Sequence, residues 1–212
     1  MWVLSRALCE SLASSPEPAG EFLPENFSGG VASALWSRAG AGVRGYGLEN
    51  LIERPGKLTE HKMPNYKRTE PLTFAGYIEG LRLRHFSPEE FTEYGERQRG
   101  GVTNGLPGVD LWENIREPAW VLDALRECLG ASITIVSCYR SPEYNAKCTG
   151  ASKRSFHLRN NAIDFKVKGV APEEAAARLK KFRAAKMFVG GVGVYKTFVH
   201  LDAGLRGKNA NW

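Results

Sequence analysis

Apolar and polar residues alternate in two short stretches near the C-terminal end of the chain, and both are predicted strands. Residues 162–167 read AIDFKV, in which every second residue is apolar, so Asp164 points away from the apolar side. Residues 198–202 read FVHLD and show the same alternation, so His200 and Asp202 share the polar side. Two such strands can present Asp164 and His200 to one cleft.

A helix is predicted to begin just after Phe86. Ser87 is a suitable cap, Pro88 fits the first turn, and Glu90 completes a capping box with Ser87. Phe86 and Phe91 stand at the spacing of a hydrophobic staple across this helix start.

The rest of the ordered region mixes helices and short strands. Further helices are predicted from Glu117 to Gly130 and from Pro172, with a loop over residues 100–111 and strands over residues 133–140 and 190–195. There is no βαβ repeat, so the predicted fold class is α+β.

Residues 1–68 differ in composition from the rest of the chain. They are rich in Gly, Pro, Ser and Ala and show no sustained period, which is typical of a disordered leader or a tether. We therefore expect two parts: a leader over residues 1–68 and one folded domain over residues 69–212.

Charge and apolar content narrow the function classes. The 212-residue chain has a net charge of +6 and a pI near 9.2, but no basic run is long enough to predict a nucleic-acid site. A basic surface also suits an anionic polymer such as the cell wall. No stretch reaches the ~20 apolar residues of a membrane span. Cys138 and Cys148 flank a predicted loop, and either a disulfide or two free thiols fits their spacing.

Three side chains in the C-terminal half form a candidate metal site: His157, Asp164 and His200. Two imidazoles and one carboxylate are ligands for one zinc ion that leave a coordination position open, as in catalytic zinc sites. His157 and Asp164 cannot both reach one ion from a regular helix, because seven residues of helix rise by ~10 Å. A turn must intervene, and Asn160 suits one because Asn tolerates left-handed backbone.

The segments around these residues resemble the signatures of the M15 zinc peptidases. Residues 155–164 read SFHLRNNAID, against the family's S-x-H-x-x-G-x-A-x-D, and residues 137–145 read SCYRSPEYN, against S-G-Y-R-S-P-x-x-N. Residues 190–193, residues 198–202 and Trp212 are similar to a subgroup of murein endopeptidases within the family. The resemblance covers roughly residues 70–212. It implies a hedgehog/DD-peptidase-like domain with a small, mainly antiparallel sheet and flanking helices.

The resemblance also implies roles for individual residues. It implies zinc ligands at His157, Asp164 and His200, and an Arg140 that faces the substrate. The Arg140 guanidinium has the planar fork that binds carboxylates, although a structural ion pair is the alternative. Ser155 is a candidate substrate-binding residue or a residue that holds the turn.

Two positions depart from the family pattern. Asn160 replaces a glycine, which is tolerable at a left-handed position. Thr197 occupies the place where several members carry a catalytic Glu, so the general base must be another acid. Asp202 is the nearest candidate, its alternative role being to orient a ligand. Asp110 or Glu113 in the preceding loop would be next.

The implied function is zinc-dependent hydrolysis of amide bonds in peptidoglycan stem or cross-link peptides. The implied protein is a monomer of the periplasm or cell envelope, or is phage-derived. The alternative is a catalytically inactive zinc-containing module that binds the wall or belongs to a virion.

Overall fold

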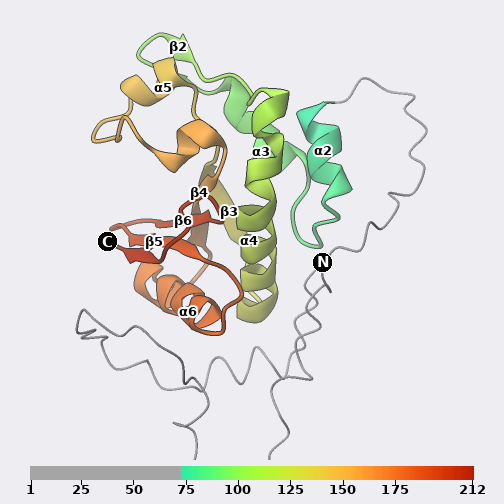
Figure 1. Ribbon diagram of the computed structural model, residues 1–212, viewed down its shortest axis with the longest axis vertical. Helices are drawn as coiled ribbons and strands as arrows, with labels where there is room; N and C mark the ends of the chain where they lie inside the picture. Colours follow the sequence, from blue (N-terminus) through green and yellow to red (C-terminus); the bar gives the residue numbers. More distant parts are fainter. Residues whose placement is uncertain (1–72) are drawn as a thin grey trace, which may run out of the picture.

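A five-stranded sheet with the order β3-β4-β6-β5-β7 forms the centre of the fold (Figure 1). The computed structural model describes residues 73–212, so the leader predicted over residues 1–68 lies outside the described residues. The strands are β3 (Ile133–Ser137), β4 (Ala162–Val167), β5 (Gly190–Val194), β6 (Val199–Ala203) and β7 (Ala210–Asn211). All neighbours are antiparallel except β5 and β7, which are parallel. The predicted α+β class with a mainly antiparallel sheet is confirmed.

Two long helices cover one face of this sheet. They are α4 (Arg116–Leu129) and α6 (Pro172–Ala184), and both pack against β4 and β6. The alternation predicted for these strands is confirmed, because the apolar residues of both strands, Ile163 and Phe165 with Val199 and Leu201, are buried in the core. Apolar burial on this face leaves the opposite face of the same strands to polar side chains.

The helix ends follow their predicted signals. Gly130 closes α4 with a φ of 58°, the left-handed conformation that glycine adopts at low cost. Pro172 occupies the first turn of α6, whose Leu179 and Phe182 are fully buried.

A smaller unit precedes α4 in the chain. It comprises α2 (Phe74–Gly80), α3 (Glu89–Thr92), η2 (Glu93–Glu96), the hairpin strands β1 (Gln98–Arg99) and β2 (Val102–Thr103), and η3 (Val109–Ile115). The predicted staple is present, with Phe86 and Phe91 edge to face at 6.1 Å between ring centroids. Only half of the capping box forms: Glu90 accepts from the Ser87 backbone N–H at 2.9 Å, but the cap position of α3 is Pro88.

Two predicted boundaries are wrong. The strand predicted over residues 133–140 ends at Ser137, after an irregularity between Ile135 and Ser137 in its pairing with β4. Beyond it, the Arg140 N–H donates to the His157 carbonyl, so the backbone has turned out of the sheet. The loop predicted over residues 100–111 is interrupted by β2 and by the start of η3. Such short elements have too few residues to show a period.

Trp212 lies against a glycine-lined strip of the sheet. Its backbone N–H donates to Val192 and its carbonyl accepts from Val194, which fixes it beside β5. A methyl group on Gly193 would lie 2.5 Å from the indole Nε1, and one on Gly191 would lie 2.9 Å from the indole ring and 2.5 Å from the Asp202 Oδ2. Gly193 is therefore required by the close approach of Trp212, and Gly191 by the approach of both Trp212 and Asp202.

This packing predicts the effect of one added methyl group. Gly193→Ala should lower the free energy of unfolding by ~1–3 kcal/mol, the usual cost of overpacking, as measured by urea denaturation. In a Trp212→Ala background the same change should cost much less, since the clashing ring is gone.

Gly80→Ala is the matched control, because nothing lies within 4 Å of a methyl group there. An equal loss of stability from Gly193→Ala in both backgrounds would contradict the assignment.

Candidate metal centre

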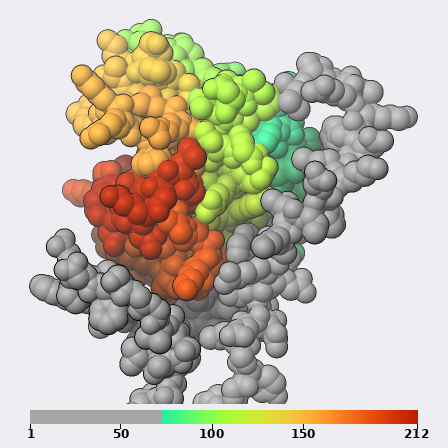
Figure 2. All heavy atoms as spheres, in the orientation of Figure 1, coloured from blue at the N-terminus to red at the C-terminus, as the bar shows by residue number. Residues whose placement is uncertain are grey.

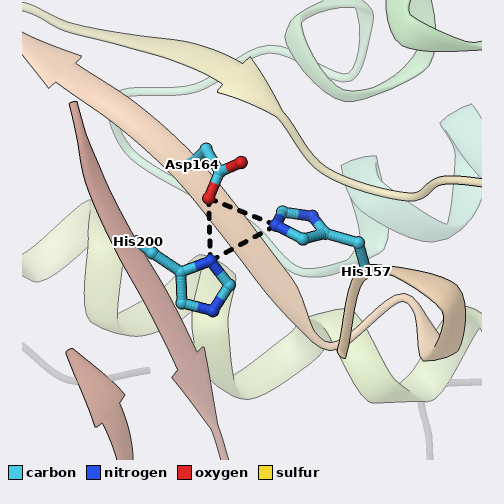
Figure 3. Close-up of side chains that lie close together, drawn as sticks. All are labelled: His157, Asp164 and His200. Carbon is cyan, nitrogen blue, oxygen red and sulfur yellow. Dashed lines mark hydrogen bonds and ion pairs between the residues drawn. The ribbon is translucent and has the colours of Figure 1, made fainter. Parts of the chain in front are cut away.

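Three buried side chains converge on the polar face of the sheet (Figure 3). The Asp164 Oδ1 lies 2.8 Å from the His200 Nδ1 and 3.1 Å from the His157 Nε2, and the two imidazole nitrogens are 3.3 Å apart. Ligand atoms ~2.0–2.1 Å from a tetrahedral zinc ion are themselves about 3.3 Å apart. The three atoms are thus spaced to hold one metal ion.

The sheet register brings two of these ligands together. Asp164 on β4 and His200 on β6 are directly paired residues of adjacent antiparallel strands, so their side chains project from the same face. The ladder therefore fixes the separation of the carboxylate and the imidazole.

A short 3₁₀ helix supplies the third ligand. His157 lies in η4 (Phe156–Arg159), where the Ser155 hydroxyl accepts from the His157 backbone N–H at 3.3 Å. Asn160 ends η4 with a φ of 52°, the left-handed backbone expected at this position. The turn returns the chain to β4 and places His157 beside Asp164.

Each ligand is held from behind by a different partner. The His157 Nδ1–H donates to the Cys138 carbonyl at 2.5 Å, and the His200 Nε2–H donates to the Asp202 Oδ2 at 3.3 Å. Arg140 donates through its Nη2 to the Asp164 Oδ2. These bonds leave the inward nitrogen lone pairs and the Asp164 Oδ1 directed at one point, as orienting partners of metal ligands do.

The electrostatics of the cluster follow from burial and pairing. Burial lowers the pKa of His157 below its ordinary value. Burial opposes ionisation of Asp164, but His157 and His200 outweigh it and hold the pKa of Asp164 well below its usual range. For His200, burial is outweighed by hydrogen bonds to Asp164 and Asp202, and its pKa is raised. Asp164 is thus a carboxylate at neutral pH.

Asp202 is fully buried behind His200, on the side away from the other ligands. Its carboxylate accepts from the Arg206 Nε at 2.8 Å, the Arg206 Nη2 at 2.6 Å and the Gly191 N–H at 3.0 Å. Burial alone would raise the pKa of Asp202, but Arg206 and His200 lower it to about 2. This placement favours the orienting role over the role of general base.

The other predicted site residues lie nearby. The side chain of Arg140 is 17% exposed, and besides its ion pair with Asp164 it donates from Nε to the Ser137 hydroxyl at 2.8 Å. Ser155 caps η4 and also lines the cleft. Cys138 and Cys148 are free thiols, so the disulfide alternative is wrong.

Sequence reasoning missed two residues that position the site. Arg206, four residues after Asp202, was not singled out, although an acid and a base at that spacing are a possible pair. Asn104 falls within the loop predicted over residues 100–111. Its buried amide donates to the carbonyls of Tyr94 and Tyr139 at 2.9 and 2.8 Å and accepts from the Ser141 N–H at 2.9 Å, so it ties the β1–β2 hairpin to the Arg140 segment.

The three candidate ligands line a cleft of about 890 Å³. In the space-filling view the segment around α5 (Pro142–Ala146) stands opposite the C-terminal strands, drawn in red (Figure 2). Asp164 is the sole carboxylate among the described residues that line the cleft. Glu113 instead accepts from the Tyr77 hydroxyl at 2.8 Å and pairs with Arg116, and neither it nor Asp110 lines the cleft.

Two known proteins have sequences similar to part of this chain. The chain is 29% identical over 146 residues to the probable peptidoglycan L,D-endopeptidase MepK of Haemophilus influenzae, which covers 63% of this chain and 75% of that protein. It is 36% identical over 78 residues to the peptidoglycan L,D-endopeptidase MepK of Escherichia coli K12, covering 34% of this chain and 40% of that protein. No solved structure matches at comparable significance.

The family assignment rests on the same segment of chain. Residues 84–202, more than half of the chain, match the family described as Peptidase M15. The matched segment contains the three converging side chains and Arg140, Asp202 and Ser155. This chain belongs to the M15 peptidases, a family of metallopeptidases.

Proposed function

We propose that this protein is a zinc-dependent peptidase that hydrolyses amide bonds in the stem or cross-link peptides of peptidoglycan. The observation that carries the proposal is the His157, Asp164 and His200 cluster, whose ligand atoms are spaced for one ion at the wall of an open cleft. The names of the relatives supply the substrate class. We also propose that the protein acts as a monomer, and that it works in the periplasm or cell envelope, where that substrate lies, or in a phage that attacks it.

The residues in and around the cluster have different proposed roles. Zinc, when bound, would polarise the scissile carbonyl and acidify a water molecule. His157 and His200 would contribute neutral nitrogens, and Asp164 one oxygen. The Cys138 carbonyl and Asp202 keep the imidazoles in the required tautomers. Asp202 is therefore proposed as a positioning residue, held in turn by Arg206.

Arg140 has two proposed tasks. Its Nη2 holds the outer oxygen of Asp164, and its Nη1 has no hydrogen-bond partner in the part of the chain that the structure describes. Since Arg140 also lines the cleft, Nη1 is available to a substrate carboxylate. One guanidinium would thus fix a ligand and a substrate group together.

A second function is a zinc-containing module that binds the wall without hydrolysing it. The specific observation in its favour is the lack of a spare acid. Position 197 is Thr, Asp202 is buried behind His200, and no carboxylate other than Asp164 lines the cleft among residues 73–212. Hydrolysis would then need a proton acceptor from the substrate or from solvent.

Digestion of purified cell walls distinguishes the two functions. The zinc-loaded protein should release peptide fragments whose masses, measured by mass spectrometry, report the bond cleaved. Treatment with a chelator should stop release, and added Zn²⁺ should restore it.

His157→Ala should lose both zinc and activity, because two protein ligands make an inadequate site. Wall binding by the zinc-loaded protein without any mass change would support the inactive module. Stoichiometric zinc in His157→Ala would contradict the metal assignment.

Asp202→Asn tests the orienting role. If Asp202 positions His200, the variant should bind Zn²⁺ ~10–100-fold more weakly in competition with a chromogenic chelator. A general base would behave differently, with zinc affinity unchanged and turnover ~10²–10⁴-fold lower. Zinc affinity within twofold of the original protein would contradict the orienting role, whatever the activity.

Arg140→Lys tests the shared fork. Lysine keeps one positive charge but cannot hold Asp164 and a substrate carboxylate in one plane. We expect kcat/KM on wall peptides to fall at least ~10-fold, the cost of one lost charged hydrogen bond. Arg82→Gln, an exposed arginine outside the cleft, is the control. Unchanged kcat/KM in Arg140→Lys would contradict the proposed role.

A further inference from the structure

The cleft is lined by arginines beyond those that pair with the acids of the candidate metal centre. Six arginines line it: Arg97, Arg99, Arg140, Arg154, Arg159 and Arg206. Arg140 is paired with Asp164, and Arg206 with Asp202. The other four have no ion pair with any carboxylate in residues 73–212, and the lining offers no further acid. A concave surface lined by one sign of charge concentrates counter-charged ligands.

Two of these unpaired arginines lie at the start of the β1–β2 hairpin. The Arg97 guanidinium lies 4.1 Å from the centroid of the Tyr94 ring, and Arg99 is in β1. Tyr94 is buried and donates its hydroxyl to the Ile135 carbonyl. The Tyr94 ring therefore restrains Arg97 before any ligand arrives, which reduces the entropy lost on binding.

The hairpin is fixed relative to the metal centre. Asn104, just after β2, accepts from Ser141 and donates to the carbonyl of Tyr139, the residues on either side of Arg140. A methyl group on Gly100, at the tip of the hairpin, would lie 3.3 Å from the Lys147 side chain. The hairpin tip therefore lies beside the end of α5, and Arg154 lines the same cleft from the loop that follows.

We propose that Arg97, Arg99 and Arg154 form an anion-binding subsite, which binds a carboxylate of the substrate peptide away from the scissile bond. This inference rests on the proposed function, because it assumes a peptide substrate. Arginine is suited to the task because its planar fork donates two parallel hydrogen bonds to a carboxylate. The preferred substrates are therefore peptides that carry at least two free carboxylates, one for Arg140 and one for this subsite.

A binding measurement isolates the subsite from hydrolysis. The probes are an uncross-linked stem tripeptide with free carboxylates and the same tripeptide with all carboxylates amidated, titrated into the full chain by calorimetry. The original protein should bind the free acid ~10-fold or more tightly than the amide, in keeping with charge-assisted hydrogen bonds. Higher salt should reduce that preference.

The double variant Arg97→Gln, Arg99→Gln should lose most of the preference and bind the two tripeptides within about threefold, the residual preference coming from Arg140, Arg154 and Arg159. Arg82→Gln, an exposed arginine outside the cleft, should keep it. A full ~10-fold preference in the double variant would overturn the subsite. Equal binding of both tripeptides by the original protein would also overturn the subsite. The same holds if the original protein binds both tripeptides equally and binds a short DNA duplex instead.

Failure of the proposed function gives a different result. If the protein hydrolyses no cell-wall peptide but still prefers the free acid through Arg97 and Arg99, the subsite stands and the enzymatic proposal falls. If hydrolysis is observed and the double variant keeps the full preference, the enzyme stands and the subsite falls.

Discussion

The pairing of Asp164 with His200 across two antiparallel strands is the constraint on which the rest of the site depends. Because side chains alternate with a period of two, a slip of one residue between β4 and β6 would separate the two groups. The slip is opposed by the core, since it would also turn the apolar residues of one strand, Ile163 or Leu201 among them, away from α4 and α6. The hydrophobic pattern that stabilises the sheet thereby sets the geometry of the candidate metal ligands.

The same arrangement handles the cost of burying charge. An unpaired carboxylate in a protein interior is strongly unfavourable. Asp164 meets this cost with Arg140 and the two histidines, and Asp202 meets it with Arg206 and a backbone N–H. Each buried acid is paired with an arginine, Asp164 with Arg140 and Asp202 with Arg206. A bound divalent metal ion would therefore not be the only positive charge that neutralises the two carboxylates. We expect for this reason that the fold does not depend on a bound metal ion.

Sequence alone could predict the features that depend on local pattern. The alternation in residues 162–167 and 198–202 indicated which side chains leave the core, and Asn160 indicated the turn that returns His157. Long-range polar contacts gave no such signal. The Cys138 carbonyl that orients His157 is a backbone atom common to every residue, and Asn104 contacts Tyr139 and Ser141 from 35 and 37 positions away. Asp202 is held beside the His200 Nε2 by Arg206 and so does not face the cleft. The position of Arg206 is known only from the folded chain, so the sequence could not predict this orientation.

Asn104 precedes Gly105, and this pair of residues has a consequence for the chemical ageing of the protein. Asparagine before glycine is prone to deamidation, in which the glycine amide nitrogen attacks the side-chain carbonyl carbon. Here the Gly105 N–H donates to the Gly95 carbonyl at 2.8 Å, and the Asn104 side chain is held by three hydrogen bonds and is 4% exposed. Both reacting groups are immobilised, so the native fold suppresses the reaction, while transient opening of the hairpin permits it. Aspartate and isoaspartate accumulating at position 104 would therefore record how often the hairpin opens during storage.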